Sequence, residues 1–284
     1  MRQSLCTITS NLEVMPGTYL MWLQAPDMAA RAQPGQFVTV KCGDFTLRRP
    51  LAIHQVGAGN TATKQSQVAL LFKVVGKGTL WLSQRQKDEK LDLLGPFGNG
   101  FSVPEQSERL LLMAGGIGIA PLVFLMQQAS SRHQITLIHG AKTAAELYAE
   151  DYWPAAVRHA VQFIPVTEDG AAGRQGMATD IVPDFLDWAD RLYACGPLDM
   201  YKAMALSPSP SPSKRDGGTI VGEGLVRSYN LKLKKCQVSL EVRMGCGFGA
   251  CYGCTIDTKK GLKRVCRDGP VFELGDILWQ EVRL

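Results

Sequence analysis

The stretch Leu110-Leu-Leu-Met-Ala-Gly-Gly-Ile-Gly-Ile-Ala-Pro-Leu-Val-Phe-Leu-Met126 decides the fold of this chain. It carries no charge, but it is shorter than the roughly 20 apolar residues that span a bilayer. Glycines and a proline stand at its centre, where a membrane helix needs continuous backbone pairing. A buried strand, a glycine turn and the start of a helix explain it better. The N-terminus shows no apolar secretory core, so we expect a soluble, cytoplasmic protein without a membrane anchor.

Strands and helices alternate along the chain around this stretch. Apolar runs at 109–114, 134–139, 161–166 and 191–194 read as strands. Helical patterns fill 120–129, 144–150 and 179–189. Alternation of this kind predicts a parallel sheet with helices on both faces.

The first hundred residues have a different texture. The segments 35–42 and 67–75 are rich in β-branched and aromatic residues and are bounded by Gly or Asn. Short strands at this spacing favour a small antiparallel barrel or sandwich. We therefore predict a multidomain fold: an antiparallel β-barrel at 1–104, an α/β parallel-sheet domain at 105–206, a Ser/Pro-rich linker or insertion at 207–221 and a small cluster domain at 222–284.

Composition agrees with this plan. A chain of 284 residues is long enough for about two domains. A hydrophobic fraction of 45% excludes disorder of the whole chain. The net charge of +5 is too mild to indicate a nucleic-acid partner. Most of that excess lies after residue 221, where 11 basic and 7 acidic residues give +4.

Four of the eight cysteines form the most informative motif. Cys246, Cys251, Cys254 and Cys266 follow the spacing C-x4-C-x2-C-x11-C, which is the plant-type ligand order of a [2Fe–2S] cluster. The intervening glycines permit positive φ angles and a close approach of backbone N–H groups to sulfur. Structural zinc and two disulfides are the alternatives. Zinc sites usually pair two short spacings, and a cytosolic chain disfavours disulfides, so iron–sulfur is favoured.

Two segments of the first domain are suited to phosphate. Arg48-Arg49-Pro50-Leu51-Ala52-Ile53 offers guanidinium groups that bind phosphate oxygens in a bidentate manner. Gly76-Lys77-Gly78-Thr79 offers small residues that let backbone N–H groups reach a phosphate. Taken alone, the first is most often solvated surface and the second is as often a plain hairpin turn.

Two segments of the second domain are placed for a nucleotide. Gly115-Gly116-Ile-Gly118 follows a predicted strand, and Pro121 suits the first turn of the next helix. The N-terminus of that helix favours an anionic pyrophosphate. Tyr193-Ala194-Cys195-Gly196-Pro197 ends the last predicted strand, at the edge where open α/β sheets bind ligands. The alternatives are a bare glycine turn and a structural cysteine.

Together these residues resemble the ferredoxin–NADP reductase superfamily, and within it the electron-transfer subunits of dihydroorotate dehydrogenase B. The similarity covers nearly the whole chain. The matching blocks are RRPLAI (48–53), LFK (71–73), GT (78–79), AGGIGIAPL (114–122), TEDG (167–170), YACGPLDM (193–200), MGCGFGACYGC (244–254) and VCRDGPVF (265–272). The cysteine block is the most specific of them.

The resemblance implies a relay from NADH to FAD, then to a [2Fe–2S] cluster, then to a partner subunit that carries FMN and the orotate site. Flavin converts a two-electron hydride into single electrons that a cluster can relay. The implied partner is the FMN-containing dihydroorotate dehydrogenase catalytic subunit, in a heterotetramer that serves pyrimidine biosynthesis. The implied FAD residues are Arg49, Pro50, Leu51, Ala52, Leu71, Phe72, Lys73, Gly78 and Thr79. Gly115, Gly116 and Gly118 would face NAD(H), Cys195 would lie near the nicotinamide–flavin contact, and the four clustered cysteines would ligate iron.

Three features depart from the family pattern. Ala52 stands where Ser or Thr is usual, so we expect weaker flavin binding. Lys142 follows the second strand in place of an acidic residue, so NAD and NADP both remain open as the nucleotide. The Ser/Pro stretch at 207–218 has no counterpart in the family.

Two other functions compete with the leading one. The first keeps the cofactors and changes the partner: a small subunit of an NADH-dependent ferredoxin:NADP oxidoreductase or of a sulfide dehydrogenase. The ending CRDGPVFELGDILW (266–279) favours the dihydroorotate branch. The second is a cofactor-poor scaffold with a structural metal, which the intact glycine and cysteine motifs oppose.

Overall fold

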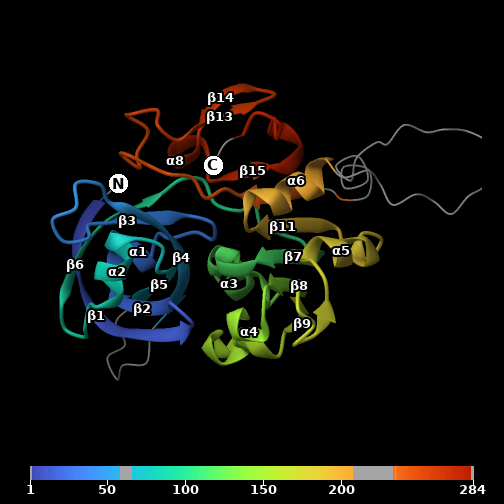
Figure 1. Ribbon diagram of the computed structural model, residues 1–284, viewed down its shortest axis with the longest axis horizontal. Coiled ribbons are helices and arrows are strands. Elements are labelled where there is room, and N and C mark those ends of the chain that lie inside the picture. Colours follow the sequence, from blue (N-terminus) through green and yellow to red (C-terminus); the bar gives the residue numbers. More distant parts are fainter. Residues whose placement is uncertain (1, 58–65, 207–232, 234, 283–284) are drawn as a thin grey trace, which may run out of the picture.

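The computed structural model describes residues 2–57, 66–206, 233 and 235–282 (Figure 1). The Ser/Pro stretch predicted as a linker or insertion lies outside the described residues. A barrel and a layered α/β part stand side by side, and the C-terminal segment lies across the top of both in the view of Figure 1. In the described part of the chain, no helix is long and apolar enough to cross a membrane.

The N-terminal part is a closed barrel, which confirms the expected antiparallel architecture. Its strands follow the order β1-β2-β5-β4-β3-β6, and the neighbouring strands pair in antiparallel fashion. Closure leaves the barrel no free edge. The strands are β1 (Arg2–Met15), β2 (Thr18–Gln24), β3 (Phe37–Val40), β4 (Arg49–Gly57), β5 (Gln67–Lys73) and β6 (Lys90–Phe97), with helices α1 (Pro26–Ala29) and α2 (Lys77–Ser83) between them.

Side chains on the two faces of β3 pack against different parts of the molecule. Val38 and Val40 point into the barrel core. Phe37 belongs instead to the cluster of buried side chains that contains Cys254 and Cys266. Since side chains alternate along a strand, one face of β3 fills the barrel and the other meets the C-terminal segment.

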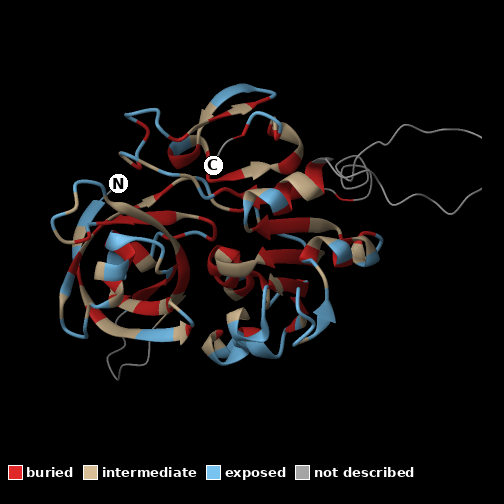
Figure 2. Cartoon of the chain, viewed as in Figure 1, coloured by how far each residue is buried: buried red, intermediate tan, exposed pale blue. Residues whose placement is uncertain are grey.

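The second part is a seven-stranded sheet in the order β10-β9-β8-β7-β11-β12-β15. The first six strands pair in parallel, and β15 is antiparallel to β12. Its strands are mostly buried (Figure 2). They are β7 (Arg109–Gly115), β8 (Gln134–Ala141), β9 (Val161–Thr167), β10 (Arg174–Gln175), β11 (Arg191–Cys195), β12 (Lys235–Ser239) and β15 (Val271–Glu273).

Helix α3 (Ile119–Ala129) explains the apolar stretch that begins at Leu110. The stretch divides into β7, a 3-10 turn η1 (Gly116–Gly118) and α3, as the sequence predicted. Nine of the eleven residues of α3 are buried, because the helix lies between the sheet and the barrel, where it contacts both β4 and β11. A helix covered on all sides is apolar all round.

The last part of the chain is built on the edge of the same sheet. β12 and β15 come from the range 222–284 that the sequence assigned to the cluster domain, yet both are strands of the seven-stranded sheet. Beyond them, β13 (Thr255–Thr258) and β14 (Gly261–Arg264) form a hairpin, followed by α8 (Val265–Asp268). The segment 246–254, called the cysteine loop below, therefore lies between two anchored elements, β12 before it and the β13–β14 hairpin after it.

Two predicted helices were wrong in form. The segment 144–150 is not a helix; it holds the 3-10 turns η2 (Ala144–Glu146) and η3 (Glu150–Tyr152). The pattern at 179–189 gives only α5 (Ala178–Ile181) and the 3-10 turn η4 (Val182–Phe185). Pro183 lacks a backbone N–H, so an α-helix does not continue through it. The short helix α4 (Ala155–Arg158) and the helix α6 (Leu198–Leu206) were not predicted.

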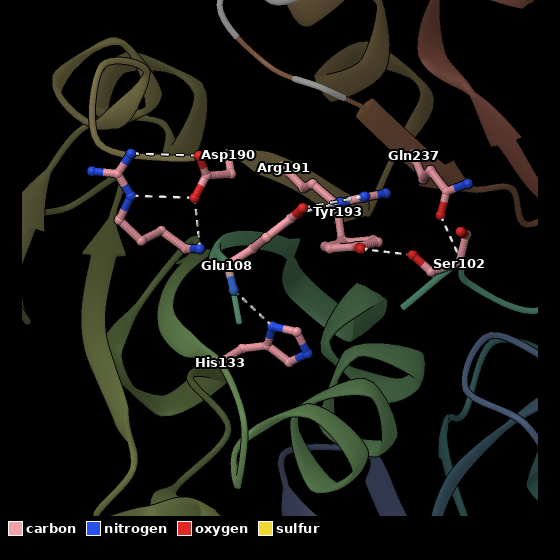
Figure 3. A network of polar contacts seen from close by, with 8 residues as sticks. Ser102, Glu108, His133, Asp190, Arg191, Tyr193 and Gln237 are labelled. Carbon is pink, nitrogen blue, oxygen red and sulfur yellow. Dashed lines mark hydrogen bonds and ion pairs between the residues drawn. The ribbon is translucent and has the colours of Figure 1, made fainter. Parts of the chain in front are cut away.

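A polar network joins the connection after the barrel to the sheet, at the end of the strands opposite the carboxyl edge (Figure 3). Tyr193 donates from its hydroxyl to the carbonyl of Ser102 at 2.8 Å, and Gln237 accepts from the N–H of Ser102 at 2.9 Å. The nearly buried Glu108 carboxylate pairs with Arg191 at 2.5 Å. The Ser102 contacts therefore tie the connection after the barrel to β11 and β12, and the Glu108–Arg191 pair ties the start of β7 to β11.

Candidate functional site

A cavity of about 750 Å³ lies where the barrel, the sheet and the C-terminal segment meet. Its size is in the range of cofactor sites. The cavity brings together most of the predicted flavin residues and the predicted contact cysteine: Arg49, Pro50, Leu51, Ala52, Leu71, Phe72, Lys73, Thr79 and Cys195. Gly78, Gly115, Gly116 and Gly118 are not among its lining residues.

Arg49 is one of three cationic side chains from the barrel that line this cavity, with Arg48 and Lys73. Its guanidinium lies 5.5 Å from the ring centre of Phe45 and donates to the carbonyl of Leu47. A Cβ on Gly78 would lie 2.5 Å from the Arg49 Nε atom. Gly78 therefore contributes by leaving room for the guanidinium, and its place in the motif has a packing cause.

Thr79 holds the turn that precedes α2. Its hydroxyl accepts from the N–H groups of Val75 at 3.0 Å and Gly76 at 3.2 Å, and donates to the Gly76 carbonyl at 3.1 Å. Lys73, at the end of β5, pairs with Glu146 at 3.6 Å. These contacts fix the rim of the cavity that carries the GKGT motif.

The glycine turn after β7 is shaped by its contact with the end of β11. A Cβ on Gly118 would lie 2.0 Å from the Cys195 carbonyl oxygen, and one on Gly115 would lie 2.7 Å from Pro197. Only glycine permits this approach. Gly116 has a φ of +52°, and its carbonyl lies 3.1 Å from Nε2 of the buried His139. The turn thereby brings Ile117, Ala120 and Pro121 to the cavity wall.

His54 ties β4 of the barrel to the α/β part of the molecule. Its Nδ1 lies 2.8 Å from the Ala120 carbonyl, and its Nε2 lies 2.9 Å from the Tyr148 hydroxyl. Burial lowers the pKa of His54 to about 4, so the ring is neutral at pH 7. A neutral imidazole has one donor and one acceptor nitrogen, which matches a carbonyl on one side and a hydroxyl on the other.

Cys195 lies at the carboxyl end of β11, fully buried against the cavity. Burial raises the pKa of its thiol well above the usual range, and the nearby Glu241 carboxylate raises it further. A thiol with a raised pKa is a poor nucleophile. Cys195 is therefore suited to pack against bound rings rather than to form a covalent bond.

The sequence reasoning missed the segment 239–244, which forms one wall of the cavity. Ser239, Leu240, Glu241, Val242, Arg243 and Met244 all line it. Glu241 is exposed toward the cavity, and desolvation by the surrounding cavity wall raises the pKa of its carboxyl group. The segment follows the carboxyl end of β12, so the rule that open sheets bind ligands at that edge would have found it had β12 been predicted beside β11.

The cysteine loop begins two residues after this cavity wall. The N–H groups of Ala250 and Cys251 point to the Cys246 sulfur at 3.2 and 3.4 Å. The Cys266 N–H lies 3.5 Å from the Cys254 sulfur. Burial raises the pKa of Cys246, but the hydrogen bonds from backbone N–H groups outweigh it and bring the pKa to about 6. Such donors stabilise thiolates and cluster sulfurs.

The four thiols lie near one another: Cys251 acts on the pKa of Cys246, and both Cys254 and Cys246 act on that of Cys266. Cys251 is exposed, and Cys254 and Cys266 are buried. Across the described ranges, no set of three or more His, Cys, Asp or Glu side chains is already gathered as metal ligands. Three sulfur donors on the glycine loop, with N–H groups directed at sulfur, and a fourth on α8 nevertheless fit an iron–sulfur cluster in donor chemistry.

Arg264 fastens this loop from β14. It donates to the Gly249 carbonyl at 2.8 Å, and its guanidinium carbon lies 4.8 Å from the ring centre of Tyr252. Gly249 has a φ of +90°, and a Cβ there would lie 3.0 Å from Arg267 Cδ. The side chains of Arg264 and Arg267 therefore adjoin the cysteine loop, where their positive charges would offset the negative charge of a cluster.

A barrel joined to a parallel sheet, with a cofactor-sized cavity at the junction, is the architecture of the ferredoxin–NADP reductases. The solved structures agree with this class. The ferredoxin NADP⁺ reductase of Neisseria gonorrhoeae with bound FAD and NADP matches 71% of this chain and 88% of its own at 18% identity, with a TM-score of 0.57; this likeness shows the fold alone.

Sequence comparison identifies the family within that class. A model described as the iron–sulfur cluster binding domain of dihydroorotate dehydrogenase B matches residues 241–278, and an oxidoreductase NAD-binding domain matches 112–205. The electron transfer subunit of dihydroorotate dehydrogenase B (NAD(+)) from Desulforamulus reducens is 36% identical over 94% of this chain and 95% of its own. The Geobacillus kaustophilus subunit is 34% identical over 96% and 97%. The chain belongs to this family of electron-transfer subunits.

Membership confirms the oxidoreductase class and the cofactor set of FAD, an iron–sulfur cluster and NAD(H). It also implies a catalytic partner subunit. One solved structure, described as an NADH-dependent reduced ferredoxin-NADP oxidoreductase in flavin-based electron bifurcation, covers 98% of this chain and 91% of its own at 26% identity, with a TM-score of 0.78. The role of each site residue and the type of cluster remain predictions.

Proposed function

We propose that this chain passes electrons from NADH, through FAD and a [2Fe–2S] cluster, to the FMN-containing catalytic subunit of dihydroorotate dehydrogenase in pyrimidine biosynthesis. One observation carries the proposal. The segment 239–244 lines the flavin-sized cavity, and Cys246 follows it by two residues. A flavin in the cavity would therefore lie beside the cysteine loop, as a relay of single electrons requires.

The residue roles follow from the cavity. Arg49 would bind the FAD pyrophosphate, because its fork pairs with phosphate oxygens. The residues that would pack around the flavin are Pro50, Leu51, Ala52, Leu71, Phe72, Lys73 and Thr79, with Gly78 giving Arg49 its space. Gly115, Gly116 and Gly118 would shape the turn on which the nicotinamide nucleotide lies, next to Cys195. Cys246, Cys251, Cys254 and Cys266 would ligate iron, and the cluster would supply one-electron storage.

The partner would dock over the cysteine loop. Phe248 and Tyr252 are exposed there, with 47% and 64% of their surface accessible. Exposed aromatic side chains beside cations are typical interface residues, and Arg264 lies against Tyr252. Charge reversal at Arg267 should slow partner-dependent turnover while NADH still reduces the flavin. Unchanged turnover would contradict this docking face.

The proposed assembly with the catalytic subunit is a heterotetramer, and its proposed location is the cytoplasm.

The visible spectrum of anaerobically purified protein tests the proposal. We expect flavin bands on a broad iron–sulfur absorption, bleached by NADH, and reoxidation of the flavin by the FMN subunit and orotate. A colourless protein that contains zinc would contradict the relay and favour the scaffold alternative.

A second function shares the cofactors: the small subunit of an NADH-dependent ferredoxin:NADP oxidoreductase. The structural similarity over 98% of the chain supports it. Reoxidation of the reduced protein by NADP⁺ with a ferredoxin-type partner, and not by the FMN subunit, would identify it. The sulfide dehydrogenase alternative would show instead in reduction by sulfide.

A further inference from the structure

Thr39 of β3 contacts the cysteine loop directly. Gly247, which follows the first cysteine of the loop, has a φ of +78°, and a Cβ there would lie 2.6 Å from Thr39 Cγ2. Thr39 and Gly247 are both buried. The contact spans more than 200 positions of sequence and links the flavin barrel to the proposed iron ligands.

Thr39 faces the cysteine module and not the barrel interior. Val38 and Val40 fill the barrel, whereas Phe37 shares a core with Cys254 and Cys266. Thr39 lies two residues from Phe37, so it points to the same side. In the β3–β4 ladder its partner is Pro50, a residue of the flavin cavity wall. Thr39 therefore stands between the flavin site and the cysteine loop.

The Thr39 hydroxyl is buried without a hydrogen-bond partner among the described residues. Its residue is only 2% exposed. Buried hydroxyls are nearly always paired, because an unpaired one loses its hydrogen bonds to water without replacement. Valine has the same shape and strong β propensity, so packing alone does not require a hydroxyl here. No residue in the described part of the chain supplies the missing partner, so a bound group would fill this role.

We propose that Thr39 tunes the reduction potential of the cluster by donating a hydrogen bond to sulfur of the cysteine-ligated centre. This inference rests on the proposed function, since it needs the cluster. The contact with Gly247 places Thr39 beside the loop that would hold the sulfurs. A donor to cluster sulfur stabilises the extra negative charge of the reduced state and raises the potential. Thr39 is a positioning residue: it ligates neither iron nor flavin.

The test compares Thr39→Val, Thr39→Ser and wild type as cluster-loaded protein, by redox titration followed with EPR. Valine keeps the shape and removes the donor; serine keeps the donor. We expect Thr39→Val to lower the ratio of reduced to oxidised cluster at a fixed potential by up to about tenfold, which is ~59 mV for one electron. Serine should restore most of the shift. An exchangeable proton coupled to the reduced cluster should be lost only with valine.

Thr136→Val is the matched control. Thr136 is also buried on a strand, but it lies on β8, where its hydroxyl bonds to Gln162 at 3.1 Å. This variant should leave the reduction potentials of the cluster and of the flavin unchanged. The inference is overturned if Thr39→Val keeps the wild-type cluster potential, if serine shifts it as far as valine, or if only the flavin potential moves. A wild-type protein without cluster EPR would instead contradict the proposed function.

Discussion

The guanidinium of Arg49 occupies the space that a side chain on Gly78 would need. The two residues lie on different elements, β4 and α2, and a Cβ at Gly78 would lie 2.5 Å from Nε and 2.8 Å from Cζ of Arg49. Arg49 therefore keeps its position on the cavity wall only if residue 78 has no side chain.

Gly78→Ala should weaken FAD binding. The methyl group would push the Arg49 guanidinium from the cavity wall, and a charge-assisted hydrogen bond to phosphate contributes on the order of 1.5–3 kcal/mol. We expect a Kd for FAD raised about 10- to 100-fold, measured by flavin fluorescence on reconstitution of apoprotein. Gly76→Ala is the control, because nothing lies within 4 Å of a Cβ there. If Gly78→Ala and Gly76→Ala bound FAD with equal affinity, Arg49 would not be part of the FAD site.

Cys251→Ser should abolish the cluster and spare the flavin. Cys251 is exposed, so the change disturbs no core, while one of four proposed iron ligands is lost. Iron content should fall, and partner-dependent turnover should drop by at least about 100-fold, with NADH still bleaching the flavin. Cys236→Ala, at a buried cysteine of β12, should keep its iron. A full iron complement in Cys251→Ser would show that this cysteine is not a ligand.

Stability should fall as the pH drops from 6.5 toward 4. Burial lowers the pKa of both His54 and His139 from 6.5 to about 4. The unfolded chain therefore binds protons more readily in this window, which favours unfolding. Each histidine accounts for roughly 3 kcal/mol over the window, since one pKa unit corresponds to about 1.4 kcal/mol.

Urea unfolding at several pH values checks this dependence. His54→Gln should reduce the pH dependence between 6.5 and 4, because one of the three buried imidazoles whose pKa is lowered (His54, His133 and His139) is gone. His159→Gln, at an exposed position, should leave it as in the wild type. If His54→Gln kept the full pH dependence, the buried imidazole would not be its source.

The carboxylates after β9 should favour NADH over NADPH. Glu168 N–H donates to the Ala141 carbonyl at 3.1 Å and Asp169 N–H to the Lys142 carbonyl at 3.4 Å, so the backbone of both acidic residues lies beside Ala141 and Lys142, at the edge where the nucleotide would bind. An acidic residue there pairs with a ribose hydroxyl and repels a 2′-phosphate. The two carboxylates would thereby offset the charge of Lys142, the cation that left NADP open in the sequence.

Glu168→Gln should raise kcat/KM for NADPH on the order of tenfold, or ~1.4 kcal/mol, with a smaller change for NADH. Flavin reduction in stopped flow measures both. Glu105→Gln, before β7 at the opposite end of the strands, is the control and should change neither. A Glu168→Gln variant with the wild-type ratio of NADH to NADPH rates would place nucleotide selection elsewhere.

Several elements were predictable because their signals are local. The run from Leu110 to Met126 defined β7, the glycine turn and α3, since apolar period and glycine placement act within a few residues. The helix predicted at 144–150 was wrong because the prediction used local signals alone. The composition of the segment favours a helix, but Tyr148 is buried against His54. That tertiary contact outweighed local propensity.

The sequence by itself determined the ligand spacing of the cysteines, the glycine turn and the order of barrel and sheet. These depend on neighbouring residues and on the types of side chain present. Only the tertiary structure decided that residues 239–244 form a cavity wall, that Gly78 makes room for Arg49 and that Thr39 meets Gly247. Such contacts join distant segments, and they depend on which strand lies beside which and which face it presents, which no local pattern specifies.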